Sequence, residues 1–183
     1  MRLIAGPPEA FRPGTVRLGR QGRHLLVHAI LADDAPESRA TADHQRMWEL
    51  GDTFEIFLRD LAGSRYIELH ITPSGHRLQL DFPENPIPLI HAGEARVEDF
   101  IVTPPLFDFL MRKATPGWEV LAVVPWPFAN RLDGRAALVS FSRYDAQPEG
   151  AEPVLSSTSA HEKATFHRQG DWTPIVFGPP ANP

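Results

Sequence analysis

Short runs of alternating hydrophobic and polar residues recur along the chain, and Gly, Pro, Asn and Asp residues separate them. Successive side chains of a strand point to opposite faces, so this period of two indicates half-buried strands, whereas helical periodicity is poor almost everywhere. We therefore expect an all-β, antiparallel β-sandwich of jelly-roll or immunoglobulin-like type with long loops at one end. The expected strands are Thr15–Leu18, His24–Ala32, Thr53–Arg59, Arg65–Thr72, His76–Asp81, Ala95–Val102, Trp118–Pro125, Ala136–Tyr144 and Pro174–Phe177.

Four other segments break the alternating pattern. Phe107–Lys113 fits either a short helix or a covering strand, and Pro127–Arg131 fits a single helical turn. Asp81–Gly93 is interrupted by prolines and is predicted to be a loop. Asp145–Asp171 is predicted to be a long polar connection, and a loop of that length in a compact domain usually has a function or moves.

Composition narrows the class of protein. The chain has 183 residues, a length that suits one domain over residues 1–183. A formal net charge of −5 gives no electrostatic reason to expect nucleic acid as a partner. No apolar run approaches the roughly 20 residues of a membrane span, and the residues after Met1 do not resemble a signal peptide. The expected location is the cytoplasm unless a leader has been removed, and the absence of cysteine excludes disulfides.

Several motifs occur in a characteristic order. Trp48–Leu58 reads W-x-x-x-D-x-F-E-I-F-L, and Tyr66–Gly75 reads Y-I-E-L-x-I-x-P-x-G. Gly117–Trp126, Gly134–Arg143 and a closing segment with Phe166-His167-Arg168 and Trp172–Phe177 follow. This series resembles the family 9 carbohydrate-binding modules, part of a wider group of DOMON-like β-sandwiches that bind sugar or haem. The resemblance implies a non-catalytic module that binds a saccharide or polysaccharide.

In family 9 modules a pair of tryptophans sandwiches a terminal sugar. Trp48 and Trp172 are therefore the first candidates for stacking on a sugar ring, and Trp126 is a weaker one. Trp118 lies in the most apolar run and is expected in the core. For the other three rings the alternative is a lid over one end of the sandwich. The cluster Ser156–Ser159 lacks the aromatic residue that the family commonly carries there.

Polar residues on two expected strands could complete such a site. The second-rank ligand candidates are Glu55, Arg59, Glu68, His70 and Arg143. These residues would form paired hydrogen bonds with sugar hydroxyls. The alternative, favoured for the carboxylates, is a solvated sheet face with a cross-strand pair such as Arg59 with Glu68. Glu119 is an acid in an apolar strand and should pair with an arginine, either Arg143 or Arg112.

Other ligands and chemistries were also considered. Family 9 modules contain structural calcium, and a possible oxygen-ligand cluster consists of Asp33, Asp34 and Asp43. A haem-b electron carrier is a second possibility, in which Met47 or Met111 would act with a histidine such as His44 or His70. A glycan-processing enzyme would need two acids across a glycosidic bond, but the spacing of the glutamates does not favour catalysis. A structural module that binds another protein is a further alternative to carbohydrate binding.

Overall fold

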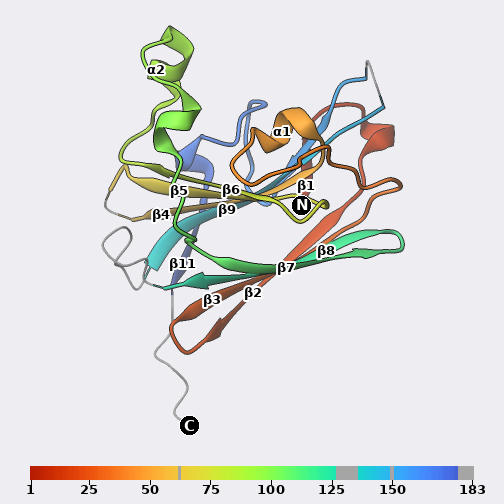
Figure 1. Ribbon diagram of the computed structural model, residues 1–183, viewed down its shortest axis with the longest axis horizontal. Helices are drawn as coiled ribbons and strands as arrows, with labels where there is room; N and C mark the ends of the chain where they lie inside the picture. Colours follow the sequence, from red (N-terminus) through yellow and green to blue (C-terminus); the bar gives the residue numbers. More distant parts are fainter. Residues whose placement is uncertain (62, 127–135, 149–150, 177–183) are drawn as a thin grey trace.

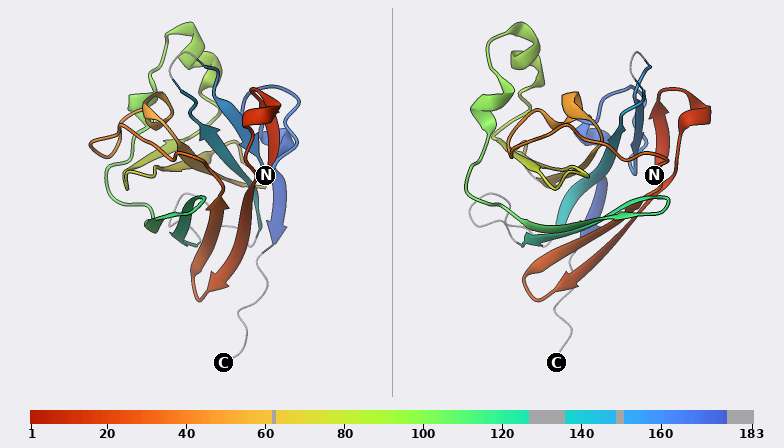
Figure 2. Two further views of the ribbon diagram at one scale, coloured as in Figure 1. Left: turned by 90° about the vertical axis from the view of Figure 1, so that its right-hand side faces the viewer. Right: turned by 45° about the vertical axis from the view of Figure 1, so that its right-hand side comes forward.

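Two antiparallel β-sheets pack face to face (Figures 1 and 2). The computed structural model describes residues 1–61, 63–126, 136–148 and 151–176. Within these residues the larger sheet has the strand order β1-β10-β9-β4-β5-β6, with β11 also paired to β9, and the smaller sheet has the order β2-β3-β8-β7. The predicted all-β, antiparallel sandwich is therefore confirmed.

The strands of the larger sheet are β1 (Arg2–Ala5), β4 (Thr53–Asp60), β5 (Tyr66–Ile71), β6 (Arg77–Phe82), β9 (Ala136–Asp145), β10 (Val154–Ser157) and β11 (Thr173–Val176). Those of the smaller sheet are β2 (Gly14–Gln21), β3 (His24–Leu31), β7 (Asp108–Ala114) and β8 (Gly117–Pro125). The helices are α1 (Met47–Leu50), α2 (Ile87–Ala92), η1 (Pro8–Ala10), η2 (Val97–Phe100) and η3 (Gln169–Asp171). Among the described residues, every helix is too short or too polar to cross a membrane.

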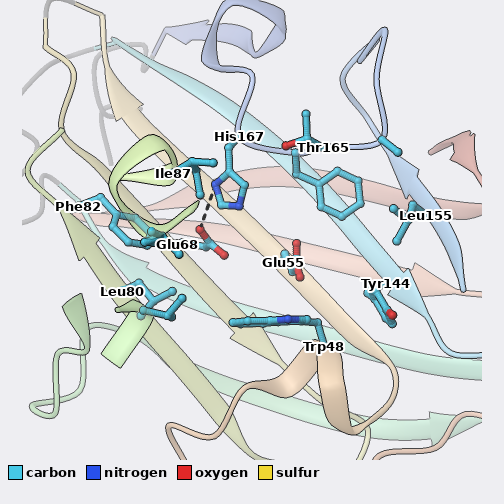
Figure 3. A pocket seen from close by; sticks show the side chains of 14 residues that line it. Trp48, Glu55, Glu68, Leu80, Phe82, Ile87, Tyr144, Leu155, Thr165 and His167 are labelled. Atoms are coloured by element: carbon cyan, nitrogen blue, oxygen red, sulfur yellow. Dashed lines mark ion pairs between the residues drawn. The ribbon is translucent and has the colours of Figure 1, made fainter. Parts of the chain in front are cut away.

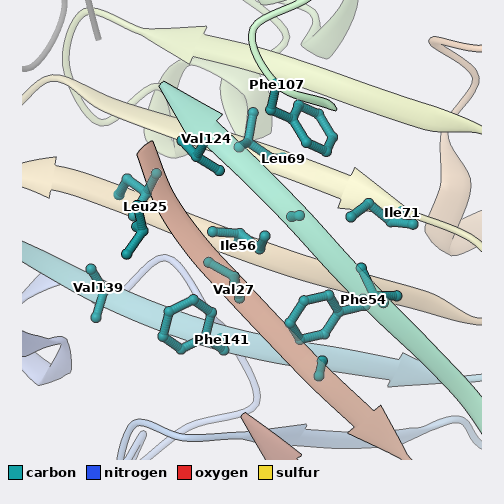
Figure 4. Close-up of a cluster of buried hydrophobic side chains, with 14 of the residues drawn as sticks. Leu25, Val27, Phe54, Ile56, Leu69, Ile71, Phe107, Val124, Val139 and Phe141 are labelled. Carbon is teal, nitrogen blue, oxygen red and sulfur yellow. The ribbon is translucent and has the colours of Figure 1, made fainter. Parts of the chain in front are cut away.

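The space between the sheets is filled by apolar side chains, which we call the inner core. Leu25, Val27 and Val124 of the smaller sheet face residues of the larger sheet across the gap (Figure 4). The partners from β4, β5 and β9 are Phe54, Ile56, Leu69, Ile71, Val139 and Phe141. Trp118 of β8 is fully buried here, as the sequence predicted. Burial of these side chains supplies the main driving force for packing the two sheets.

Register explains how the larger sheet presents its two faces. Glu55 of β4 pairs with His70 of β5, and Phe57 pairs with Glu68. Because side chains alternate along a strand, these four residues share the face that points away from the smaller sheet. We call it the outer face.

Several predicted elements differ from the structure. Ala95–Val102 was predicted to be a strand, but it contains the 3-10 helix η2, in which the carboxylate of Asp99 accepts a hydrogen bond from the Arg96 N–H (2.8 Å). That local hydrogen bond competes with strand pairing. The loop predicted over Asp81–Gly93 includes α2, which starts beside Pro86 and ends at Gly93 with a left-handed φ of 74°.

The remaining differences concern short strands. β10 lies within the connection predicted over Asp145–Asp171, and it pairs with both β9 and β1. The sequence did not predict β1 or α1. Phe107–Lys113 contains most of β7, so the strand alternative is right and the helix is not. The helical turn predicted for Pro127–Arg131 lies outside the described residues.

Candidate functional site

The outer face of the larger sheet is covered by loops and short helices rather than by solvent. A second set of apolar side chains packs there, which we call the outer cluster: Ala40, Met47, Phe57, Tyr66, Leu78, Leu80, Phe82, Phe166 and Trp172. The rings of Phe57 and Tyr66 lie 5.4 and 5.5 Å from the ring of Trp172. The covering segments carry α1, α2, η2 and the residues around Phe166. This cover turns an open sheet face into a cavity wall.

A cavity of about 280 Å³ lies between the outer face and these covering segments. Figure 3 shows the ring of Trp48 on one side of the cavity, with Glu55, Glu68 and His167 facing into the same space. The remaining lining is mostly apolar, from residues such as Leu80, Phe82, Ile87 and Leu155. A concave apolar site with a few convergent polar groups is the usual form of a small-molecule site, and this volume lies just below the roughly 300–1,000 Å³ of most such sites.

The polar groups of the cavity form one connected network. His70 Nε2 lies 2.6 Å from Glu68 Oε1, and His70 Nδ1 lies 3.7 Å from Glu55 Oε1. His167 Nδ1 lies 3.7 Å from Glu68 Oε2 and hydrogen-bonds with the hydroxyl of Tyr66 at 3.0 Å. The two glutamates of this network are almost fully buried, with Glu55 5% exposed and Glu68 4% exposed.

Burial shifts the pKa of each group in this network toward its neutral form. It raises the pKa of Glu55 to about 7, with the neighbouring His70 acting in the opposite direction. It also raises the pKa of Glu68. It lowers the pKa of His70 and that of His167. The cavity therefore holds ionisable groups whose pKa values are shifted by burial, an arrangement that is frequent at functional sites.

The structure brings four of the predicted site residues together. Trp48, Glu55, Glu68 and His70 meet at the cavity, and the rings of Trp48 and His70 are 5.6 Å apart. The alternative of a solvated face for the two carboxylates is wrong, because loops cover that face. Arg59 does not pair with Glu68 but donates to the amide oxygen of Gln169 at 2.7 Å, outside the cavity lining.

Three other predicted ligand residues are held in packed surroundings. Trp172 is 3% exposed, and its indole N–H donates to the carbonyl of Phe166 at 2.9 Å. Trp126 is 6% exposed and belongs to the inner core. Arg143 is fully buried and pairs with Asp33 at 2.5 Å and with Asp145 at 3.0 Å. Neither ring offers an open face for stacking, and Arg143 serves the packing of β9 instead.

The predicted calcium cluster is not assembled, because its three aspartates point to different partners. Asp34 lies at the surface and pairs with Arg12 at 2.6 Å, whereas Asp43 accepts from the backbone N–H of Arg77 at 2.9 Å. Asp33 points inward to Arg143.

Asp33 instead lies beside Asp52 and Asp145. Arg143 pairs with Asp33 and Asp145 of this trio, and Asp52 accepts from the backbone N–H groups of Glu37 (2.6 Å) and Ala146 (2.8 Å). All three carboxyl groups therefore already have partners within the protein.

The methionines considered for haem are committed to packing. Met47 is fully buried in the outer cluster, and Met111 packs against the inner core. Among the described residues, neither lines the cavity. Haem binding stays a prediction without a ligand pair in this structure.

Glu119 pairs with Arg112, whose Nε lies 3.0 Å from Glu119 Oε2. The Arg112 alternative is therefore right. The carboxylate sits on the far side of the smaller sheet from the inner core and does not contribute to the cavity.

Three polar residues that line the cavity were not among the predicted ligand residues. Tyr144, Thr165 and His167 line the cavity, yet they come from β9 and from the connection predicted to be a polar loop. In the sequence, only the Phe166-His167 pair pointed toward the site, because it belongs to the closing motif of the family. The contact of His167 with Tyr66 depends on how the loop folds back over β5, which local patterns do not specify.

Neither a protein-family model nor the sequence of a curated protein matches this chain. Solved structures do match it. A candidate carbohydrate-binding protein from Bacteroides uniformis ATCC 8492 superposes with a TM-score of 0.69 at 18% identity, covering 96% of this chain and 84% of its own.

A family 9 carbohydrate-binding module from Caldicellulosiruptor kristjanssonii also matches, in two structures. Its complex with glucose gives a TM-score of 0.63 at 10% identity and covers 93% of this chain and 78% of the module. Its complex with cellotriose gives 0.60 at 12% identity, covering 100% and 88%. The chain is thus a β-sandwich with the fold of the family 9 carbohydrate-binding modules.

Proposed function

We propose that the chain is a non-catalytic carbohydrate-binding protein whose site is the cavity on the outer face. The observation that carries this proposal is the arrangement of an indole ring, Trp48, and two buried carboxylates, Glu55 and Glu68, around one cavity. The fold supports it, since structures of the same fold bind glucose and cellotriose.

Each side of the cavity would recognise a different part of a sugar. The flat apolar ring of Trp48 would pack against the C–H face of a pyranose, because aromatic rings combine a large contact area with rigidity. The carboxylates would accept hydrogen bonds from ring hydroxyls, and hydrogen bonds to a charged acceptor are the stronger kind. The cavity volume of about 280 Å³ suits a single sugar unit rather than a whole oligosaccharide.

We expect a longer saccharide to extend from this cavity into a neighbouring one. Trp48 and Tyr144 also line a second, larger cavity of about 890 Å³. Because the same two rings line both cavities, a chain whose end unit sits beside Glu55 would continue past them. Charged residues line much of the second cavity, for example Arg12 and Glu49.

The positions of the carboxylates favour binding over hydrolysis. Glu55 and Glu68 project from neighbouring strands of one sheet, on the same side of the cavity. Hydrolysis of a glycosidic bond places one carboxyl group on each side of the reacting carbon. An acid of that kind opposite Glu55 does not occur among the described residues that line this cavity.

The test is a titration of the protein with glucose, cellotriose and other small saccharides, followed by tryptophan fluorescence and by calorimetry. We expect a saturable signal with at least one sugar, and we expect Trp48→Ala to weaken that binding at least about tenfold. Trp48→Phe retains an aromatic ring, so its sugar affinity should lie between that of the native chain and that of Trp48→Ala. Calorimetry is needed because the other tryptophans also fluoresce.

The matched control is Leu18→Ala, which removes a 42% exposed apolar side chain from the smaller sheet. It should leave both affinity and fold unchanged. Binding that survives Trp48→Ala in a folded protein would place the sugar elsewhere, and an absence of binding across the whole panel would overturn the proposal.

A further inference from the structure

The floor of the cavity holds a compact set of metal-ligand groups. One ligand atom from each of Glu55, Glu68 and His70 lies within 4.8 Å of the others, and all three residues are buried. Within the described part of the chain, Glu55 and Glu68 form ion pairs with histidines alone. His70 contacts both carboxyl groups, and His167 contacts Glu68. In their ionised forms these two carboxylates have no arginine or lysine beside them among the described residues, so burial favours either their protonation or the binding of a cation.

Two atoms of this set are also left without a hydrogen bond. In the residues that the structure describes, His70 Nδ1 and Glu68 Oε2 are buried and have no hydrogen-bond partner. When Glu68 is ionised, its oxygen only accepts, so a neutral His70 donates from Nε2 to Glu68 Oε1 and keeps a free lone pair on Nδ1. That lone pair faces Glu55 Oε1 at 3.7 Å. A proton on the Glu55 carboxyl group or a metal cation between the two atoms would satisfy both acceptors.

We propose that Glu55, Glu68 and His70 form a binding site for a divalent cation of the zinc class at the floor of the cavity. Ligand atoms about 2.1 Å from a zinc ion stand roughly 3–4 Å apart, which the 3.7 Å contact between His70 Nδ1 and Glu55 Oε1 satisfies. An imidazole nitrogen beside carboxylates suits zinc better than calcium, which takes oxygen ligands.

The surroundings have the form that metal-binding histidines usually have. The hydrogen bond between His70 Nε2 and Glu68 Oε1 holds the imidazole ring in place and leaves His70 Nδ1 and Glu68 Oε2 as the two unpartnered atoms of the set. The ring of Trp48 lies beside that of His70, with 5.6 Å between the ring centres and a tilt of 55°. The cavity lies next to Glu55 and Glu68, so a coordination position stays open toward it.

The test uses the whole chain after treatment with a chelator, and no sugar is added. Zn²⁺ is titrated by calorimetry, and Co²⁺ is titrated by visible absorption as a probe of a low-coordinate nitrogen and oxygen site. We expect one equivalent of each metal to bind. Glu55→Gln keeps the shape of the side chain and should weaken binding at least about tenfold, and His70→Gln should do the same.

The matched control is His28→Gln, which breaks another His–Glu contact, that of His28 with Glu119 at 3.8 Å on the smaller sheet. It should leave the affinity for Zn²⁺ unchanged, and Ca²⁺ should not bind at the cavity. Absence of a one-to-one Zn²⁺ complex would overturn the proposal. So would a complex that is lost in His28→Gln and kept in Glu55→Gln.

Should His70→Gln fail to fold by circular dichroism, Glu55→Gln decides alone. Glu55 is chosen because it makes no hydrogen bond to another described residue that the substitution would break. The sugar titrations are run separately in chelator. A failure to bind metal and a failure to bind sugar are therefore separate results.

Discussion

The two faces of the larger sheet are equally buried but built from different residues. On β4, Phe54 and Ile56 point into the inner core, while Glu55 and Phe57 point to the outer face, and all four are at most 5% exposed. The inner face meets another sheet, which offers only apolar partners. The outer face meets loops, which can supply polar side chains such as His167 and leave a cavity.

This difference shows where stability and recognition reside. Apolar packing on the inner face depends on close contact over a large area, and each side chain there has one task. The outer face combines an apolar cluster with a polar network, so part of its burial stabilises the fold while another part is kept open for a ligand. Buried polar groups at a cavity are costly for stability and are common at functional sites.

The largest effect is expected from the inner face. Trp118→Ala should lower the free energy of unfolding by about 3–5 kcal/mol, because it removes a fully buried indole and leaves a cavity. Chemical denaturation followed by circular dichroism measures this. The control Leu110→Ala truncates a 72% exposed side chain on the smaller sheet and should be close to neutral.

Sugar affinity per folded molecule should be unchanged in Trp118→Ala, since the ring lies between the sheets. A loss below about 1 kcal/mol would show that the inner core relaxes around the gap. A loss of binding without a loss of stability would contradict the division between the two faces.

The second largest effect is expected in the loops that cover the outer face. Trp172→Phe retains an aromatic ring but removes the indole N–H that donates to the carbonyl of Phe166, leaving that buried acceptor unsatisfied. We expect a loss of about 1–3 kcal/mol in the free energy of unfolding. Trp48→Phe, at a half-buried ring, should cost less than about 1 kcal/mol. If the two variants cost the same, Trp172 is not anchored as the structure indicates.

The alternating pattern was sufficient to predict the sheets, because alternation depends on local side-chain direction. It was not sufficient to predict what covers a face. Glu55 and Glu68 fit a solvated strand and a buried site equally well in sequence. The difference depends on α1, α2 and the loop around Phe166, which pack through contacts distant along the chain.

The candidate site was therefore predicted in part. Trp48, Glu55, Glu68 and His70 lie on or next to strands whose register follows from alternation, and these residues do meet. Trp172 could not be assigned, because its burial results from tilted and edge-on contacts with Phe57 of β4 and Tyr66 of β5. A tryptophan in a loop and one packed beneath it look alike when only the sequence is known.

The smallest effect concerns the pH dependence of the covering loop. Burial lowers the pKa of His161, although Asp171, whose carboxylate lies 3.4 Å from Nδ1, acts in the opposite direction. The folded state therefore binds this proton less readily than the unfolded chain does. Stability from the neutral ring is present above the unfolded pKa of about 6.5 and is lost as pH falls through the lower folded value.

Because the raised pKa of Glu55 acts in the opposite direction over the same range, the comparison is between variants: from about pH 7 to pH 5 the melting temperature of the native chain should fall further, or rise less, than that of His161→Gln. The nearby charge of Arg168, which also pairs with Asp171 at 2.9 Å, opposes protonation of His161 and should strengthen the effect. His24→Gln, at an exposed position on the smaller sheet, is the control and should leave the slope unchanged. A slope that His161→Gln retains unchanged would mean that His161 does not contribute to the pH dependence.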